Sequence, residues 1–500
     1  MIISKAYDVE IFPNLFSVTF VDMSSYFKTF SDCVDTKGKP IALTEKLSVA
    51  EIKERLNKVE SKIFWISDTD DSQLIELVGY INSMEARYNL ITDNTGNSYQ
   101  EAVRHDVFGF NSKSYDDNMI RAFLMRFNRF DSTKHLITYL YETSKKLIDL
   151  QKDKCAFYED KSIQEIRKYR LPYQGIDVQQ LYGLHAAGVN IDKDSGERIK
   201  FGKSLKQTSI NLKWHELLDF TLLPINDKEA EYYRKKDHYR GMSCKELNLL
   251  ITNDFDRYVL PEYIEPMLYY NKNDVFLVCE MCRQKPEEVR LRYSLSNAFN
   301  INVLSSARSN IGDKLLVKFY SEMSGLKEKD FIKLRTERKK LSFKKIIFPH
   351  IRFKTKQLQD LLEEMKNISI YRTNKDSFCK EIDFYGTKYT LATGGIHTQD
   401  TPGVFKSTDD AVFVHWDYTS YYPSIMIAYN IAPKHLNQPV FTKMVSYFKD
   451  TRVACKHTSD EDKLIITGVS NSLSAEALKI VINAIYGKFG ERFVAEVKRP

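Results

Sequence analysis

The chain has 500 residues, 43% of them apolar, so its length predicts about three domains and its composition excludes wholesale disorder. Lysine and arginine number 74 and aspartate and glutamate 67, and the net charge of +7 permits an anionic partner such as nucleic acid without requiring one. No stretch approaches the roughly 20 apolar residues of a membrane helix, and the N-terminus carries acids where a signal peptide is apolar, so we expect a soluble, cytoplasmic protein with no membrane partner.

The first predicted elements are two strands joined by a turn. Residues 2–12 and 15–23 alternate in polarity and are rich in β-branched side chains, and Pro13-Asn14 between them suits the turn. Helical spacing follows over residues 72–83, 116–128, 133–170 and, after a charged proline boundary near 283–290, over 287–322.

The second half returns to strands and then to helices. Strands are predicted over 382–395 and 411–416, and helices over 420–430, 439–456 and 474–489. We therefore expect a multidomain protein of α/β and α+β class, with its chemistry where strands pass into helices.

Four acidic residues in the first half point to a metal site. Asp8 and Glu10 are two apart on a predicted strand, so both side chains face the same way. Buried together they would repel, and a divalent cation relieves that repulsion; a solvent-facing strand pair explains them equally well. Asp116 can open a helix, and Asp274 shares a helix face with Tyr270, whose hydroxyl could orient an attacking water. Together the four carboxylates would hold two Mg²⁺ ions, which activate water and stabilise a leaving 3′ oxygen.

These residues occur in an ordered set of motifs. The chain carries Asp-x-Glu first, then Asn111 four residues before Tyr115, which Asp116 follows directly, then Tyr270 four residues before Asp274. This order resembles the three exonuclease motifs of DEDDy-type 3′→5′ exonucleases, the proofreading domains of family B DNA polymerases. The resemblance implies a ribonuclease H-like domain in which Tyr270 is catalytic, Asn111 and Tyr115 contact DNA, and the metal ligands are Asp8, Glu10, Asp116 and Asp274.

A further short element lies between the second and third motifs. Ser204-Leu205 looks like the Ser/Thr-Leu element that holds single-stranded DNA in such domains. A plain loop-to-helix cap at Ser204 explains the same residues as well.

In the second half, Asp417 follows a predicted strand and precedes Ser420-Tyr421-Tyr422-Pro423. An aspartate at the end of a strand is suited to hold Mg²⁺ against a triphosphate, and proline suits the first turn of a helix. The segment resembles motif A of family B DNA polymerases, with Tyr421 in place of a leucine. The resemblance implies that Asp417 is a catalytic metal ligand and that Tyr422 lies under the incoming sugar and excludes ribonucleotides.

Another polymerase-like segment follows on a predicted helix. Lys479, Asn483 and Tyr486 share one helical stripe, where the lysine can meet phosphate oxygens, the tyrosine can pack against a base pair, and Gly487 permits close approach. The segment resembles motif B of the same family, with Ala484 in place of a serine.

Two weaker signals fit the same family. Arg452 and Lys456, four apart on a basic helix, look like the fingers-helix pair that binds the triphosphate tail. Gly394 and Gly395 occupy the place of a Tyr-x-Gly-Gly element that contacts DNA, although Ala392 stands where the tyrosine would be.

The resemblance covers nearly the whole chain. It implies an exonuclease domain, a helical linker with the start of the palm, a palm segment with motif A, fingers with motif B, and the start of a returning palm, over residues 1–285, 286–379, 380–438, 439–490 and 491–500.

The third palm motif of the family, Asp-Thr-Asp after motif B, is not found; Asp68-Thr69-Asp70 has these letters but precedes a predicted helix in the first half. We therefore expect either a truncated product or a split polymerase whose second polypeptide supplies the remaining palm and thumb.

The resemblance implies a DNA-directed DNA polymerase with 3′→5′ proofreading that replicates a phage genome in the host cytoplasm. Its cofactors would be two Mg²⁺ ions per active site, with Mn²⁺ able to substitute. Its partners would be primer–template DNA, single-stranded DNA 3′ ends and deoxynucleoside triphosphates. The alternatives are a stand-alone 3′→5′ exonuclease and a non-catalytic nucleic-acid-binding subunit.

Overall fold

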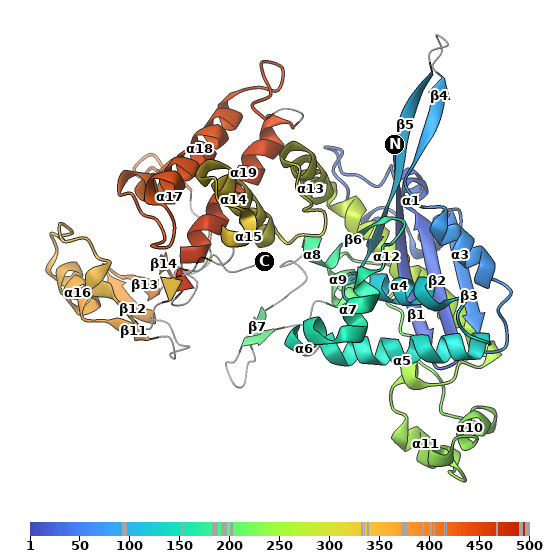
Figure 1. Cartoon of the computed structure of the whole chain (residues 1–500). Coiled ribbons are helices and arrows are strands. Elements are labelled where there is room, and N and C mark those ends of the chain that lie inside the picture. The colour runs from blue at the N-terminus through green and yellow to red at the C-terminus, as the bar shows by residue number, and fades with distance from the viewer. Residues whose placement is uncertain are drawn as a thin grey trace. The chain divides into compact units, whose positions relative to one another are not determined.

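The structure, a computed structural model, divides into two compact units, Met1–Arg290 and Leu291–Pro500 (Figure 1). Both units mix helices and strands. Within the described part of the chain, no helix is long and apolar enough to cross a membrane. The residues described are 1–92, 98–151, 154–182, 189–191, 198–200, 204–331, 334, 336–337, 340–371, 379–392, 395–399, 403–404, 406–414, 416, 418–466, 469–489 and 494–495.

A mixed sheet forms the centre of the first unit. Its strands follow the order β3-β2-β1-β5-β4, and β6 also pairs with β5. The β1–β5 and β5–β6 pairs are parallel, whereas β1–β2, β2–β3 and β4–β5 are antiparallel. The strands are β1 (Ile2–Phe12), β2 (Leu15–Asp22), β3 (Ser61–Ser67), β4 (Arg87–Thr92), β5 (Ser98–Gly109) and β6 (Gln174–Asp177).

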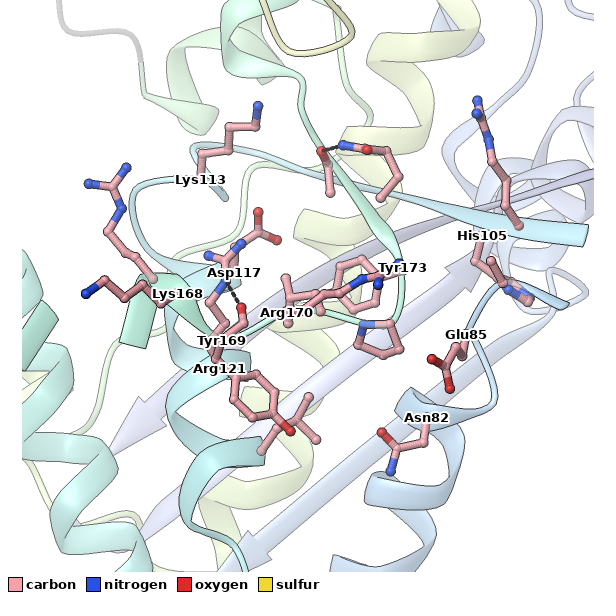
Figure 2. Close-up of a pocket in the computed structure, with 18 residues that line it drawn as sticks. Asn82, Glu85, His105, Lys113, Asp117, Arg121, Lys168, Tyr169, Arg170 and Tyr173 are labelled. Carbon is pink, nitrogen blue, oxygen red and sulfur yellow. Dashed lines mark hydrogen bonds between the residues drawn. The ribbon is translucent and has the colours of Figure 1, made fainter. Parts of the chain in front are cut away.

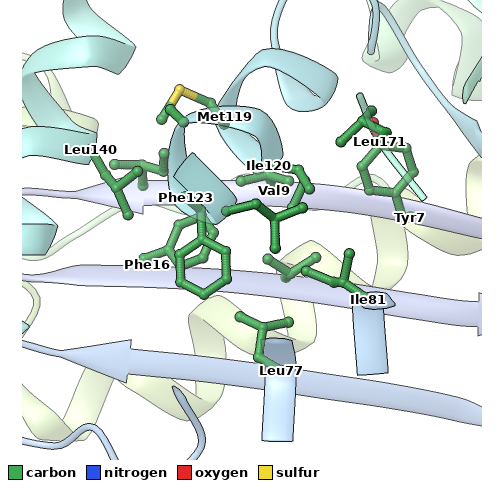
Figure 3. Packing of buried hydrophobic residues seen from close by; sticks show 14 of the residues in the cluster. Tyr7, Val9, Phe16, Leu77, Ile81, Met119, Ile120, Phe123, Leu140 and Leu171 are labelled. Carbon is green, nitrogen blue, oxygen red and sulfur yellow. The ribbon is translucent and has the colours of Figure 1, made fainter. Parts of the chain in front are cut away.

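The alternation of β1 divides its side chains between two environments. Tyr7, Val9 and Ile11 are buried in the largest core of the unit, where they pack with side chains of several helices, three of which contribute labelled residues in Figure 3. These three helices are α3 (Leu74–Asn82), α4 (Asp116–Arg126) and α5 (Thr133–Gln151). Asp8 and Glu10 point the other way, as the period of two requires. On that side α12 (Pro261–Gln284) packs on β1 and β2.

The remaining elements of the first unit are short helices and one small hairpin. They are α1 (Met23–Thr29), α2 (Val49–Leu56), α6 (Lys154–Glu159), α7 (Lys161–Lys168), α8 (Gln179–Tyr182), β7 (Val189–Ile191), β8 (Arg198–Lys200), α9 (Leu205–Asn211), α10 (Asp227–Arg234) and α11 (Cys244–Leu250). Single 3₁₀ turns lie at Leu43–Glu45, Asp237–Tyr239 and Asp254–Asp256.

The second unit is built on three packed helices, α14 (Arg308–Ser324), α18 (Gln438–His457) and α19 (Asn471–Phe489). Gly312 lets α14 approach α19 closely, because a Cβ at this position would overlap the Cβ of Ala484. The other helices are α15 (Glu328–Phe331), α16 (Lys356–Lys366) and α17 (Tyr421–Ala428), with a 3₁₀ turn at Phe343–Lys345, and α13 (Pro286–Phe299) contains the boundary between the two units.

The strands of the second unit form small separate sheets. The largest has the order β12-β13-β14, in which β12 and β13 are joined by a turn with positive φ at Tyr385 and Gly386. Two positive φ angles match the twist of a two-residue hairpin. The strands are β9 (Thr336–Glu337), β10 (Lys340–Ser342), β11 (Ser369–Tyr371), β12 (Cys379–Phe384), β13 (Thr387–Ala392), β14 (Gly395–Thr398) and β15 (Val494–Ala495).

Most elements expected from the sequence are found, with shifted ends. The pair of N-terminal strands and the helices near 72–83, 116–128, 420–430, 439–456 and 474–489 are confirmed. The long helical stretches over 133–170 and 287–322 are interrupted. The strand predicted over 411–416 was wrong for the residues described there, where Val412, Phe413 and Trp416 are largely exposed. A strand needs a neighbour to complete its hydrogen bonds, and no described strand pairs with this segment.

Candidate functional site

A cleft of about 780 Å³ in the first unit brings together residues that are far apart in the sequence. Eight of the residues predicted for the exonuclease site line it: Asp8, Glu10, Asn111, Tyr115, Asp116, Ser204, Leu205 and Asp274. The cleft thus draws on β1, the β5–α4 loop, the starts of α4 and α9, and α12.

The strand β1 supplies two of the carboxylates. Asp8 and Glu10 lie opposite Thr19 and Ser17 of β2, two small polar residues that are fully buried. Asn271 of α12 donates a hydrogen bond from Nδ2 to Oδ2 of Asp8, over 2.8 Å. This hydrogen bond ties the Asp8 carboxylate on β1 to α12.

The turn between β5 and α4 supplies three more cleft residues. Asn111 has a left-handed backbone, with φ of 58°, and its N–H donates to Oδ1 of Asp177 at 3.0 Å. Asp116 is buried at the first position of α4, where the helix dipole favours negative charge. The hydroxyl groups of Tyr115 and Ser144 share a hydrogen bond of 2.6 Å, which fixes the Tyr115 ring against α5.

The other two segments come from α12 and α9. Tyr270 does not line the cleft itself, but it lies one helical turn before Asp274. The hydrogen bond of its hydroxyl with the Asp274 carboxyl lowers the pKa of that carboxyl. Ser204 caps α9 by accepting a hydrogen bond from the N–H of Gln207 at 3.1 Å. Ser204 thus both caps α9 and lines the cleft. A helix cap and a DNA-binding element are therefore both compatible with Ser204-Leu205.

The pKa values of the four carboxyl groups are all raised above the ordinary values of aspartate and glutamate. Burial raises the pKa of Asp8, and the charge of Asp274 raises it further. Burial likewise raises the pKa of Glu10, followed by the charges of Asp8, Asp274 and Asp116. The pKa of Asp116 is raised by burial and then by Asp8. Burial raises the pKa of Asp274 to about 7, against the opposing effect of the Tyr270 hydroxyl.

This electrostatic pattern fits a divalent cation. Carboxylate oxygens are the ligands that Mg²⁺ prefers, and a cation among them would offset their mutual repulsion. Within the described residues, however, no three His, Cys, Asp or Glu side chains stand close enough together to hold a metal ion. The residues therefore fit Mg²⁺ in ligand chemistry and charge, although their positions among the described residues do not form a three-ligand site.

The cleft also contains groups that the sequence motifs did not identify. Tyr141 donates to Oδ1 of Asp256 at 2.7 Å, and Lys145 pairs with the same oxygen at 3.3 Å. Lys145 lies over the Tyr141 ring, 5.6 Å from its centre. The spacing of four on α5 places Tyr141 and Lys145 on one face, but this spacing is common on ordinary surface helices.

A second predicted set meets in the other unit. A pocket of about 370 Å³ is lined from α14, α18 and α19 by Arg308, Arg452, Lys456, Ala475, Glu476, Lys479, Ile480 and Asn483. Four of these are residues predicted to bind nucleotide, namely Arg452, Lys456, Lys479 and Asn483. Sequence reasoning missed Arg308, which pairs with Glu476 at 3.3 Å.

The chemistry of this pocket suits an anion. Four cationic side chains and one carboxylate line it. The Nε of Arg452 is buried and has no hydrogen-bond partner among the residues that the structure describes, while its Nη1 donates to Oγ of Ser420 at 3.4 Å. An oxyanion would supply the missing acceptor.

The other predicted residues of the second unit are not all placed. Tyr422 lies on α17 with its side chain 45% exposed, and it does not line the pocket. The backbone of Tyr486 and Gly487 belongs to α19, and Gly395 begins β14. Asp417 and Gly394 lie outside the described residues.

The comparisons with known proteins add no relative. No model of a protein family matches the chain. A search of curated proteins likewise finds no match.

Proposed function

We propose that this chain is a nucleic-acid-processing enzyme. Its first unit would be a Mg²⁺-dependent 3′→5′ exonuclease with a ribonuclease H-like fold, and its second unit would hold part of the nucleotide site of a family B DNA polymerase. The observation that carries the proposal is the cleft of the first unit. Residues from each of the three short motifs, together with Ser204-Leu205, line this one cavity although they come from separate parts of the sequence.

The described residues support distinct roles in hydrolysis. Asp8, Glu10, Asp116 and Asp274 would hold two Mg²⁺ or Mn²⁺ ions, which when bound supply an activated water and stabilise the leaving 3′ oxygen. Asn271 fixes Asp8 through its hydrogen bond. The Tyr270 hydroxyl, which interacts with the Asp274 carboxyl, would orient the attacking water.

The remaining cleft residues would bind the substrate strand. Tyr115 presents an aromatic ring whose hydroxyl is tied to Ser144. Ser204 and Leu205 lie at the start of α9 on the same cleft. Lys145, 50% exposed, supplies a cation suited to a phosphate of the strand.

The basic pocket of the second unit supports the polymerase part of the proposal. Lys479 and Asn483 are exposed on one stripe of α19, while Leu478, Val481 and Ile482 on its other side are buried. The stripe faces the same pocket as the α18 pair. This arrangement suits the triphosphate of a deoxynucleotide.

The test is a gel of a 5′-labelled primer–template incubated with the chain and Mg²⁺, with and without deoxynucleotides. We expect shortening of the primer that is lost in the double variant Asp8→Asn, Glu10→Gln. Asp131→Asn, Glu142→Gln is the matched control, because both acids are exposed and lie outside the cleft.

Each alternative predicts a different outcome. Shortening that survives the double variant would overturn the assignment of the cleft. Salt-sensitive DNA binding without any shortening would favour a non-catalytic binding subunit. Shortening without selective binding of a deoxynucleotide would favour a stand-alone exonuclease.

A further inference from the structure

The first unit contains a second large cavity, of about 940 Å³, on another part of its surface (Figure 2). Among the described residues, it shares no lining side chain with the acidic cleft. It is bordered by the segment 167–175, which leads from α7 into β6, and by the start of α4. We call it the basic groove.

The side chains that line this groove are mostly cationic where they are charged. Six cationic residues line it: Arg104, Lys113, Arg121, Arg167, Lys168 and Arg170. The acids among its lining residues are Glu85 and Asp117. Asp117 is buried and accepts a hydrogen bond of 2.6 Å from the hydroxyl of Tyr7, so its carboxylate already has a partner inside the protein.

Part of this cationic set is held in place. Arg121 donates from Nε to the carbonyl oxygen of Tyr169 at 3.1 Å and from Nη1 to Oδ1 of Asn118 at 2.9 Å. The guanidinium of Arg167 lies over the ring of Tyr158, 4.8 Å from its centre. These contacts fix the segment that leaves α7, so the groove does not depend on a free loop.

Other cations of the groove form no salt bridge with a described residue, although Lys113 interacts electrostatically with Asp117 and Asp177. Lys113, Lys168 and Arg170 are exposed, and none of them forms a salt bridge with a residue that the structure describes. Tyr169, between two of them in sequence, has a side chain 39% exposed. Unpaired cations alternating with an exposed ring suit phosphates and bases in succession.

We propose that the basic groove binds a single-stranded nucleic acid, with Lys113, Lys168 and Arg170 on its phosphates and Tyr169 stacked on a base. A strand fits better than one small phosphate, because the cations are spread over three elements of the groove, namely β5, the start of α4 and the segment 167–175. This site goes beyond the proposed exonuclease cleft, although the two lie on either side of one helix start. Asp116 lines the cleft, and its neighbour Asp117 lines the groove.

The experiment measures the affinity of the whole chain for a fluorescent oligothymidylate by anisotropy, in EDTA and over a range of salt. The test variant is Lys113→Gln, Lys168→Gln, Arg170→Gln. The control is Lys28→Gln, Lys37→Gln, Lys39→Gln, which removes the same charge from exposed lysines that do not line the groove. Circular dichroism checks that both variants are folded.

We expect the test variant to bind about tenfold or more weakly, and its salt slope to fall by about 2, because each phosphate contact on a single strand contributes about 0.7 to that slope. The control keeps the parent affinity and slope. Equal losses in both variants, or no loss in the test variant, would overturn the proposal.

Two further measurements sharpen the result. Tyr169→Leu should weaken binding about fivefold or more without changing the salt slope, because it removes stacking and no charge. Tripolyphosphate is then added at equal phosphate concentration. If it displaces the oligonucleotide, the groove takes a small polyphosphate and the assignment to a strand is wrong.

The outcome is independent of the exonuclease proposal. Groove-dependent binding by a chain that does not shorten DNA in Mg²⁺ would contradict the exonuclease and support the groove. If the chain shortens DNA but its binding is unchanged by the groove substitutions, the exonuclease proposal is supported and the groove proposal is contradicted.

Discussion

Asn271 on α12 donates a hydrogen bond of 2.8 Å to Asp8 on β1, across 263 residues of sequence. The other amide atom, Oδ1 of Asn271, is buried and has no hydrogen-bond partner in the described part of the chain. Asn271 therefore connects the helix that carries Asp274 to the strand that carries Asp8 and Glu10. It acts on the cleft by positioning a carboxylate.

The first prediction concerns this contact. Asn271→Ala should lower the affinity for Mg²⁺ by about 10- to 100-fold, the usual cost of losing a partner behind a metal ligand. The Mg²⁺ dependence of primer shortening measures it, and saturating Mg²⁺ should restore most of the rate. Asn248→Ala, which removes an amide bonded to Ile225 elsewhere in the unit, is the control. Unchanged Mg²⁺ dependence in Asn271→Ala would show that Asp8 is not a ligand.

The second prediction concerns pH. The pKa of Asp274 is raised to about 7, above the ordinary value of an aspartate, so between about pH 4 and 7 the folded chain binds a proton that the unfolded chain has released. The free energy of unfolding contributed by this group therefore falls as pH rises through that window. In EDTA, Asp274→Asn should stabilise the chain at about pH 8 and have little effect near pH 4.

Urea unfolding at both pH values measures this difference. Mg²⁺ at the higher pH should stabilise the parent chain more than the variant, because only the parent retains the full set of carboxylates. A variant that is less stable than the parent at high pH, without metal, would contradict the raised pKa.

The third prediction concerns a buried ion pair in the last turn of α12. Arg283 forms two hydrogen bonds of 2.7 Å with Glu280, and Tyr26 donates to the same carboxylate at 2.9 Å. Because Glu280 is fully buried, Glu280→Ala leaves the Arg283 charge without its partner and should lower the free energy of unfolding by about 3–5 kcal/mol.

Urea unfolding also tests this value. The control is Glu54→Gln, which breaks the exposed Glu54–Lys58 pair and should leave the unfolding free energy unchanged within error. Similar effects of the two substitutions would show that the buried pair does not anchor α12.

The fourth prediction concerns the pocket of the second unit. Lys479→Ala should weaken the binding of a Mg²⁺–deoxynucleoside triphosphate by roughly tenfold to a hundredfold, the range expected for a lost hydrogen bond to a charged group. A titration with a fluorescent deoxynucleotide measures it. Lys443→Ala, an exposed lysine on α18 that does not line the pocket, is the control. If the parent chain and Lys479→Ala bind the deoxynucleotide with equal affinity, the proposal that this pocket binds a nucleotide is contradicted.

Arg308 extends that prediction to a residue that no motif indicated. It pairs with Glu476 at the pocket, and Arg308→Ala should weaken nucleotide binding in the same titration. Glu476→Gln, which releases Arg308 from its carboxylate, should strengthen binding. A loss of affinity in Glu476→Gln would contradict the role of Arg308.

The sequence by itself determined the local features of this protein. Alternation in β1 placed Asp8 and Glu10 on one face, and helical spacing placed Lys479 with Asn483 on one stripe, because these relationships depend only on the period of the backbone. Sequence spacing failed for residues 411–416, where an apolar run needed a partner strand that only the tertiary structure could supply.

The tertiary structure alone decided which distant segments meet. Through the packing of α12 and α5 on the sheet, Tyr141 and Lys145 became part of the cleft and Asn271 came to donate a hydrogen bond to Asp8. The basic groove likewise joins the end of α7 to the start of α4, about fifty residues apart. Such contacts arise from the packing of elements with long sequence separation, and no local pattern of residues encodes them.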